Sequence, residues 1–175
     1  LGPRDDAKLL RVIDEPMPRT PEFRASLRDG RQLIPLREEL EIARVYERME
    51  QHRLGDRLQV DWQLGPLPED TQVPGLVIQP LLENAIYHGI EPMPQPGRIQ
   101  VSGESVDGMV RISVSNPLPP SASAPRHGNR IALDNIRERL ELAFGVRGVL
   151  SVIDSVPGMF TVTIEFPAGA QVLPA

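Results

Sequence analysis

Two neighbouring segments place the tightest limit on what this chain can fold into. Residues 98–105 (RIQVSGES) and 109–116 (MVRISVSN) each alternate apolar and polar side chains, and Asp107 and Gly108 lie between them. An Asp-Gly pair between two alternating segments is a strong signal for a β-hairpin. One face of this hairpin is apolar, so the fold must bury that face against another layer.

The other segments predict a similar strand pair, a single strand and several helices. In residues 57–64, Leu58, Val60, Trp62 and Leu64 alternate with polar residues, as in a half-buried strand. Helices are expected at 34–56, 77–90 and 131–145, and a second hairpin at 148–155 and 159–167, around Pro157-Gly158. Helices mixed with antiparallel strands favour an α/β fold in which one sheet carries helices on a single face.

Composition excludes several classes of site and protein. The 175 residues include no cysteine, so disulfides and thiolate metal sites are excluded. The formal net charge of -5 argues against a general nucleic-acid binder. Residues 1–22 are polar and rich in proline, and we expect them to be a linker or a vector-derived segment.

Residues 77–90 combine an apolar helical face with three chemically active groups, Glu83, Asn84 and His88. Asn84 and His88 are four residues apart and share a helix face. An amide oxygen suits Mg²⁺, and a carboxylate can accept a proton during phosphoryl transfer. The simpler interpretation is that these groups face solvent and that His88 is a favourable cation near the helix C-terminus. Both interpretations stay open on the residues alone.

Three segments together resemble the GHKL ATP-binding superfamily, as found in LytS-like sensor histidine kinases. Residues 79–90 (QPLLENAIYHGI) resemble its N box, and residues 133–145 (LDNIRERLELAFG) resemble the segment after its G2 box. Residues 37–58 resemble the stretch that joins the dimerisation helices to the catalytic domain. The resemblance implies a Bergerat-type two-layer α/β sandwich, with a mixed, mostly antiparallel sheet and helices on one face. It also implies ATP and Mg²⁺ as cofactors.

The same resemblance assigns roles to particular residues. Glu83 matches the candidate catalytic base, and Asn84 matches the Mg²⁺ ligand. Asn116 stands where the family's G1 Asp contacts adenine, and Tyr87 stands where many relatives carry Lys. The implied nucleotide-binding residues are Asn84, His88, Asn116, Gly128, Arg130, Ala132 and Leu133.

The glycine boxes depart from the family pattern. Glycines let backbone N–H groups approach phosphates closely, but bulkier residues stand at most of these positions: Leu118 and Pro120 in G1, Arg130 and Ala132 in G2, and Met159-Phe160 in place of the late Gly-Thr pair. Two outcomes stay open. Arg130 can add a charge-assisted phosphate contact, or the side chains narrow the cleft so that ATP binds weakly or not at all.

The resemblance implies the catalytic domain of a two-component sensor kinase. None of the histidines, His52, His88 and His127, lies in an acceptor motif, so we expect the phosphoacceptor upstream of this chain. We divide the chain into residues 23–55 (tail of a dimerisation helix and connecting helix), 56–169 (ATP-binding domain, with residues 117–129 as its lid) and 170–175 (tail).

The implied partners are a response regulator with a LytTR-type DNA-binding domain and a second copy bound through upstream helices, with no direct nucleic-acid or membrane contact. The implied location is the cytoplasmic portion of an inner-membrane bacterial sensor. The alternative is a non-catalytic module that docks the regulator or its own dimerisation helices.

Overall fold

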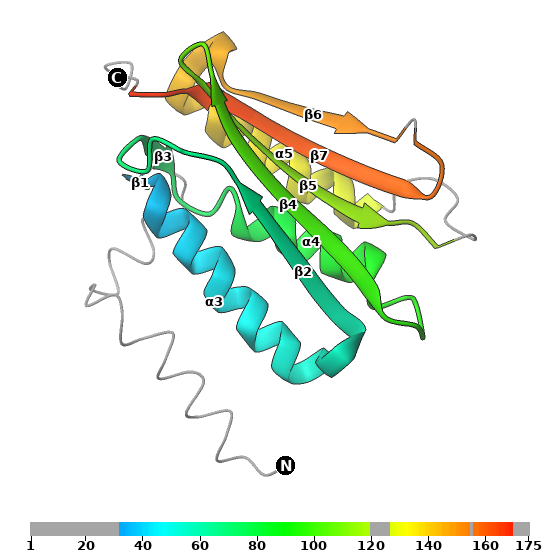
Figure 1. The fold of residues 1–175 in the computed structure, drawn as a ribbon. Helices are drawn as coiled ribbons and strands as arrows, with labels where there is room; N and C mark the ends of the chain where they lie inside the picture. The colour runs from blue at the N-terminus through cyan, green and yellow to red at the C-terminus, as the bar shows by residue number, and fades with distance from the viewer. Residues whose placement is uncertain (1–31, 120–126, 155, 170–175) are drawn as a thin grey trace.

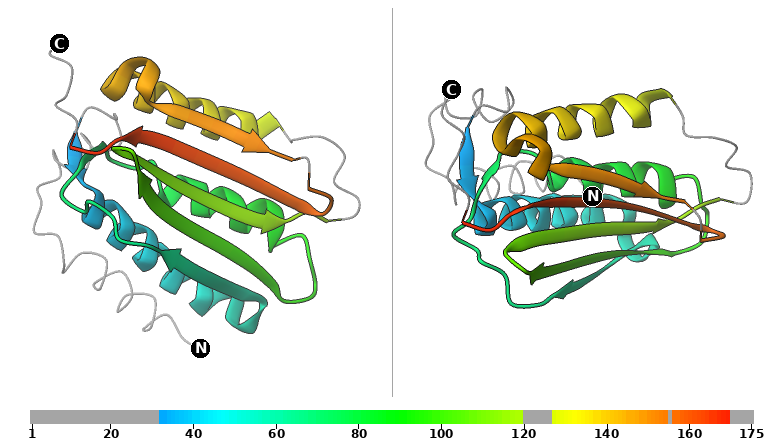
Figure 2. Two further views of the ribbon diagram at one scale, coloured as in Figure 1. Left: turned by 45° about the horizontal axis from the view of Figure 1, so that its top comes forward. Right: turned by 90° about the horizontal axis from the view of Figure 1, so that it is seen from above.

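The computed structural model describes residues 32–119, 127–154 and 156–169, which form two layers (Figures 1 and 2). A five-stranded sheet makes one layer, and helices α3, α4 and α5 cover one of its faces. This confirms the predicted α/β sandwich. The elements are β1 Leu33–Pro35, α3 Leu36–Leu54, η1 Gly55–Arg57, β2 Leu58–Leu64, β3 Gln72–Pro74, α4 Gln79–Gly89, β4 Gly97–Val106, β5 Met109–Pro117, α5 His127–Phe144, η2 Gly145–Arg147, β6 Val149–Ile153 and β7 Met159–Pro167.

The large sheet has the strand order β2-β4-β5-β7-β6. β2 pairs with β4 in parallel, and the other neighbours are antiparallel. The predicted β4–β5 hairpin is confirmed, because Val106 pairs with Met109 across the turn. Asp107 and Gly108 have φ angles of 51° and 74°, and two consecutive positive φ angles are what a two-residue type I′ turn requires. The hairpin of β6 and β7 is also confirmed.

Alternation along β5 and β7 separates the two faces of the sheet. Val114 pairs with Val162, and both are buried against the helices. One residue along, the Ser113 Oγ and Thr163 Oγ1 atoms lie 2.8 Å apart, on the face that carries no helix. Successive side chains of a strand point to opposite faces, so the pattern read from the sequence fixes which face is covered.

The core fills the space between the sheet and the helices. α3 joins it through Leu36, Leu40 and Ala43, which are 0–5% exposed. Because α3 packs into the same core as the sheet, the described part of the chain is one packed unit on both sides of the predicted boundary at residue 55. Other fully buried side chains are Ile78, Leu81, Leu82, Ile86, Ile90, Ile99, Ile112, Ile136, Leu140 and Phe166.

A polar contact also joins α3 to β2. The Trp62 Nε1 atom donates a hydrogen bond of 2.6 Å to the Glu47 carboxylate. The Arg44 guanidinium lies 4.4 Å from the centre of the Trp62 ring, in a cation–π contact. Trp62 therefore binds two side chains of the helix beside it.

The structure differs from the sequence-based expectations in two places. β1 and β3 form a small antiparallel sheet, with Ile34 opposite Val73, although residue 34 was expected to begin a helix and no strand was expected at residues 72–74. α5 begins at His127, before the expected start at residue 131. The predictions for residues 1–31, 120–126 and 170–175 lie outside the described residues. No helix in the described ranges is long and apolar enough to cross a membrane.

Candidate functional site

α4 carries the predicted N box and lies between α3 and α5 under the sheet (Figure 1). It begins with proline in its first turn, which suits a position whose N–H has no helical partner. It ends at Gly89, after 11 residues. The candidate site consists of α4, the end of β5 and the start of α5.

Asn84 is the most unusual side chain on α4. It is 7% exposed, and no hydrogen bond joins its amide to any other described residue. Among the described residues, Arg57 Nε is the buried side-chain nitrogen or oxygen without a hydrogen-bond partner, so the Asn84 amide atoms reach solvent and are open to a ligand. Glu83, one residue earlier, is exposed. The two predicted functional groups therefore differ sharply in their surroundings.

The negative charge of Glu83 acts on a residue of α3. Burial raises the pKa of the Tyr46 hydroxyl on α3, and the negative charges of Glu50 and Glu83 raise it further. The Glu83 carboxylate thus lies close enough to Tyr46 for its charge to act there. His88 is half-buried, and its ring meets the Tyr87 ring edge-on with the ring centres 4.9 Å apart.

Asn116 lies at the end of β5, against the end of α4. A Cβ atom added to Gly89 would lie 2.7 Å from the Asn116 Cβ and 2.9 Å from the Pro117 carbonyl oxygen. The structure therefore brings the predicted G1 position into contact with the helix that carries the N box. Asn84 is five residues from Gly89, about 7.5 Å along the helix axis. That Glu83, Asn84 and Asn116 line one cleft stays a prediction.

The Asn116 side chain has a defined orientation. It is 1% exposed, and its Nδ2 atom donates a hydrogen bond of 2.9 Å to the Pro117 carbonyl oxygen. Its Oδ1 atom makes no hydrogen bond within the described ranges. The oxygen is the atom that can accept a hydrogen bond from an amino group.

The G2 positions lie inside α5. Arg130 is exposed, Ala132 is half-buried, and Leu133 belongs to the hydrophobic core. The first four N–H groups of a helix have no intrahelical partner. In α5 these include residues 127–129, Gly128 among them, whereas the N–H groups of Arg130, Ala132 and Leu133 are used within the helix. The available backbone donors therefore lie upstream of the expected G2 position.

The other locations considered for a site lack the predicted catalytic and nucleotide-binding residues. An open hollow of about 670 Å³ is lined by residues 67–72 and Gly169, and none of the predicted site residues lines it. His52 is exposed in the last turn of α3, as expected for a residue at a helix end. No group of three His, Asp or Glu side chains in the described ranges could hold a metal ion.

The sequence analysis missed three charged residues that hold α4: Glu39, Arg57 and Arg139. Glu39 is fully buried and accepts hydrogen bonds from the backbone before α4. The sequence contained one signal, because Glu39 falls on the same helical face as Leu36 and Ala43, where a carboxylate is out of place. The partners of these residues lie far along the chain, so the sequence could not supply them.

Comparisons with known proteins agree with the fold and the order of segments. No protein-family model matches the chain. It is 31% identical over 126 residues to the sensor histidine kinase YesM of Bacillus subtilis, covering 70% of this chain and 22% of that protein. It is 33% identical over 131 residues to the sensor histidine kinase YpdA of Escherichia coli, with coverage of 70% and 23%. It is 31% identical over 158 residues to the sensor protein LytS of Bacillus anthracis, with coverage of 83% and 27%.

The chain thus spans about a quarter of the length of the curated relatives it matches. Among solved structures, the nucleotide-free catalytic domain of the histidine kinase ThkA matches with a TM-score of 0.59 and 19% identity, covering 78% of this chain and 95% of that one. Full-length ShkA in complex with AMPPNP matches with a TM-score of 0.55 and 16% identity, with coverage of 82% and 33%. The chain is similar to the catalytic portion of sensor histidine kinases, LytS among them, and its fold is that of histidine kinase catalytic domains.

Proposed function

We propose that a chain with this fold and these relatives is the ATP-binding catalytic domain of a LytS-like sensor histidine kinase, of the type of the alginate regulatory sensor AlgZ, also called FimS. In this proposal it phosphorylates a histidine on an upstream dimerisation helix, and the phosphate passes to a response regulator with a LytTR-type DNA-binding domain. The protein acts as a homodimer through the upstream helices, and this chain is the cytoplasmic portion of an inner-membrane bacterial sensor. Similarity to YesM, YpdA and LytS over most of the chain supports the proposal.

The Asn84 amide carries this proposal, because it lies at a mostly buried position of α4 and makes no hydrogen bond within the described residues. A hard oxygen ligand on a helix, used together with nucleotide phosphates, is how proteins commonly hold Mg²⁺. The bound ion neutralises charge on the phosphates during transfer. In this proposal Glu83, the neighbour of Asn84, orients the attacking histidine and accepts its proton. The Asn116 Oδ1 atom is left to accept a hydrogen bond from the adenine amino group.

A second candidate is a non-catalytic module that docks the response regulator or its own dimerisation helices. The helical conformation at Arg130 and Ala132 favours it. Phosphate binding through backbone N–H groups needs donors that are free, and α5 uses the N–H of Ala132 internally. In this second reading the kinase fold persists as a binding surface without nucleotide.

Titration calorimetry with ATP and Mg²⁺ separates the two candidates. The parent should bind with micromolar affinity, and chelating the Mg²⁺ should weaken the binding. Asn84→Leu keeps the side-chain volume and removes the amide, so its affinity should fall by about tenfold or more, the loss of one hydrogen bond to a charged group. Asn135→Leu is the matched control, because Asn135 is exposed on α5. No binding by the parent at millimolar ATP would support the docking module instead.

A further inference from the structure

Charged side chains from α3 and from the η1 turn after it hold both ends of α4. α3 has 19 residues and α4 has 11, so they are about 28 Å and about 16 Å long. Glu39, near the start of α3, contacts the start of α4, and Arg57, just after α3, contacts its end. The two helices therefore run side by side in the same direction, and the longer helix spans the shorter one.

At the first end, the Glu39 carboxylate replaces a missing helix cap. The cap residue of α4, Ile78, has no side chain that could accept a hydrogen bond. Glu39 Oε1 accepts the N–H of Leu76 at 2.5 Å, and Oε2 accepts the N–H groups of Val77 at 3.1 Å and Ile78 at 3.0 Å. A negative charge also suits the positive end of the helix dipole. Burial raises the pKa of the Glu39 carboxyl, and these N–H groups together with the Arg139 charge oppose that rise.

The backbone that Glu39 grips is strained. Leu76 has a φ of 60°, a conformation that non-glycine residues seldom adopt. The Arg139 Nη1 atom on α5 donates to the carbonyl oxygens of Gly75 at 2.8 Å and Leu76 at 3.4 Å. The Glu39 carboxylate thus binds the N–H groups of this segment, and the Arg139 guanidinium binds its carbonyl oxygens. Strained backbone persists only where its surroundings fix it, so the start of α4 depends on these contacts.

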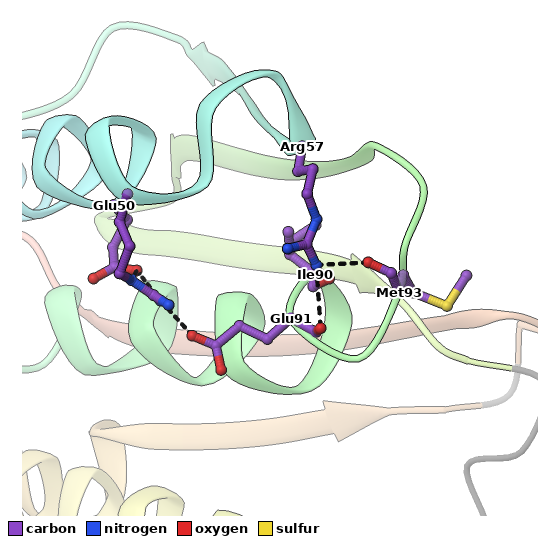
Figure 3. A network of polar contacts seen from close by, with 6 residues as sticks. Glu50, Arg57, Ile90, Glu91 and Met93 are labelled. Atoms are coloured by element: carbon purple, nitrogen blue, oxygen red, sulfur yellow. Dashed lines mark hydrogen bonds and ion pairs between the residues drawn. The ribbon is translucent and has the colours of Figure 1, made fainter. Parts of the chain in front are cut away.

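At the second end, positive charges meet the C-terminal end of α4 (Figure 3). The Arg57 Nη2 atom donates to the carbonyl oxygens of Ile90 at 3.4 Å, Glu91 at 3.2 Å and Met93 at 2.7 Å. Arg53, in the last turn of α3, pairs with the carboxylates of Glu50 and Glu91. A cation suits the negative end of the helix dipole. Each end of α4 is therefore held by the charge that its dipole favours.

Glu83 and Asn84 lie between these two contacts. We propose that Glu39 and Arg57 are positioning residues that fix α4, and with it Glu83 and Asn84, to α3, so that a movement of α3 carries the site with it. This deepens the proposed function and rests on it for any effect on nucleotide. The contacts at the two ends of α4 are separate, so each can be removed while the other stays intact.

The test compares Glu39→Gln and Arg57→Met with Glu41→Gln, which changes an exposed carboxylate on the same helix. Amide hydrogen exchange is measured across the folded chain. Glu39→Gln should accelerate exchange at residues 76–78 about tenfold, the loss expected for hydrogen bonds to a charged group, and Arg57→Met should do so in the last turn of α4. Exchange in β5 and β7 should stay as in Glu41→Gln. A merely structural role would accelerate exchange throughout the sheet.

Affinity for ATP with Mg²⁺ is measured on the same three variants and on the parent. Weaker binding by about tenfold in the first two variants, with Glu41→Gln unchanged, supports the positioning role. If the parent binds no nucleotide, the proposed function fails, and exchange alone decides the positioning claim. Exchange at residues 76–90 equal to that of Glu41→Gln overturns the inference. So does unfolding of both variants at 25 °C, because the contacts would then stabilise the whole fold instead of placing one helix.

Discussion

Gly89→Ala should destabilise the protein, although the same change inside a helix usually stabilises it. The added Cβ would lie 2.7 Å from the Asn116 Cβ, 2.7 Å from its Nδ2 and 2.9 Å from the Pro117 carbonyl oxygen. Ordinary contacts of a Cβ begin near 3.4 Å. Two of these three atoms are fixed by the backbone of β5, so α4 and β5 must move apart by several tenths of an ångström.

The size of the effect follows from two opposing terms. Replacing glycine by alanine in a helix gains about 0.5–1 kcal/mol. Forcing a methyl group into a packed contact costs about 1–3 kcal/mol. The net loss in the free energy of unfolding should be about 1 kcal/mol, the difference between the middle values of the two ranges, measured by urea denaturation followed by circular dichroism. ATP affinity should fall as well, because the same displacement separates Asn116 from α4.

Two further variants test whether the clash at Gly89 causes the loss of stability. Gly65→Ala is the control, because its Cβ would meet only the Gly103 carbonyl oxygen at an ordinary 3.5 Å, and its stability should stay within about 0.5 kcal/mol of the parent. Asn116→Gly removes two of the three clashing atoms. The double variant should therefore lose less stability than the sum of the single losses. A Gly89→Ala protein as stable as the parent would refute the close approach of α4 to β5.

Three other outcomes are expected. A triple variant with the changes Pro120→Gly, Arg130→Gly and Ala132→Gly should bind ATP more tightly in calorimetry. Glycine at position 120 regains a backbone N–H, and one hydrogen bond to a charged phosphate contributes about 1.5–3 kcal/mol. Each of the two helical glycines loses about 0.5–1 kcal/mol and removes a side chain from the approach to the phosphates. If Arg130→Gly alone abolishes the parent's binding, Arg130 is itself the ligand and the reasoning fails. The chain should not autophosphorylate with labelled ATP, and stable label on any histidine would contradict the upstream acceptor. Gly148→Ala should lower the free energy of unfolding by about 3 kcal/mol in urea denaturation, because the added Cβ would lie 2.3 Å from the Leu140 carbonyl oxygen. An unchanged free energy of unfolding would show that the contact relaxes freely.

Local patterns predicted the parts of the fold that depend on nearby residues. Asp107 and Gly108 define their hairpin by their own backbone preferences, so the sequence predicted it correctly. The β1–β3 pairing joins segments of three residues each, with Leu33 opposite Pro74. Strands of three residues are too short to show an alternation of apolar and polar residues, and their pairing depends on packing that the sequence does not display.

The sequence likewise predicted only part of the candidate site. The resemblance identified Asn84 and Asn116, but their burial and the unused Asn84 amide follow from packing alone. The expected start of the last helix at residue 131 came from the spacing of apolar residues, whereas the helix itself begins at His127. The role of Glu39 depends on N–H groups that lie 37 to 39 residues further along. No local pattern contains that relation.

The contact of Trp62 with α3 gives the protein a native optical reporter. The chain has one tryptophan, and its indole N–H donates to Glu47 while Arg44 covers its ring. Indole emission changes with the polarity and charge around the ring, so the wavelength and intensity of this single fluorophore report whether α3 is seated on β2. With no cysteine in the chain, thiol-reactive dyes can be added at chosen positions without competing labels. Energy transfer from Trp62 to such a dye would follow α3 in solution without altering the helix.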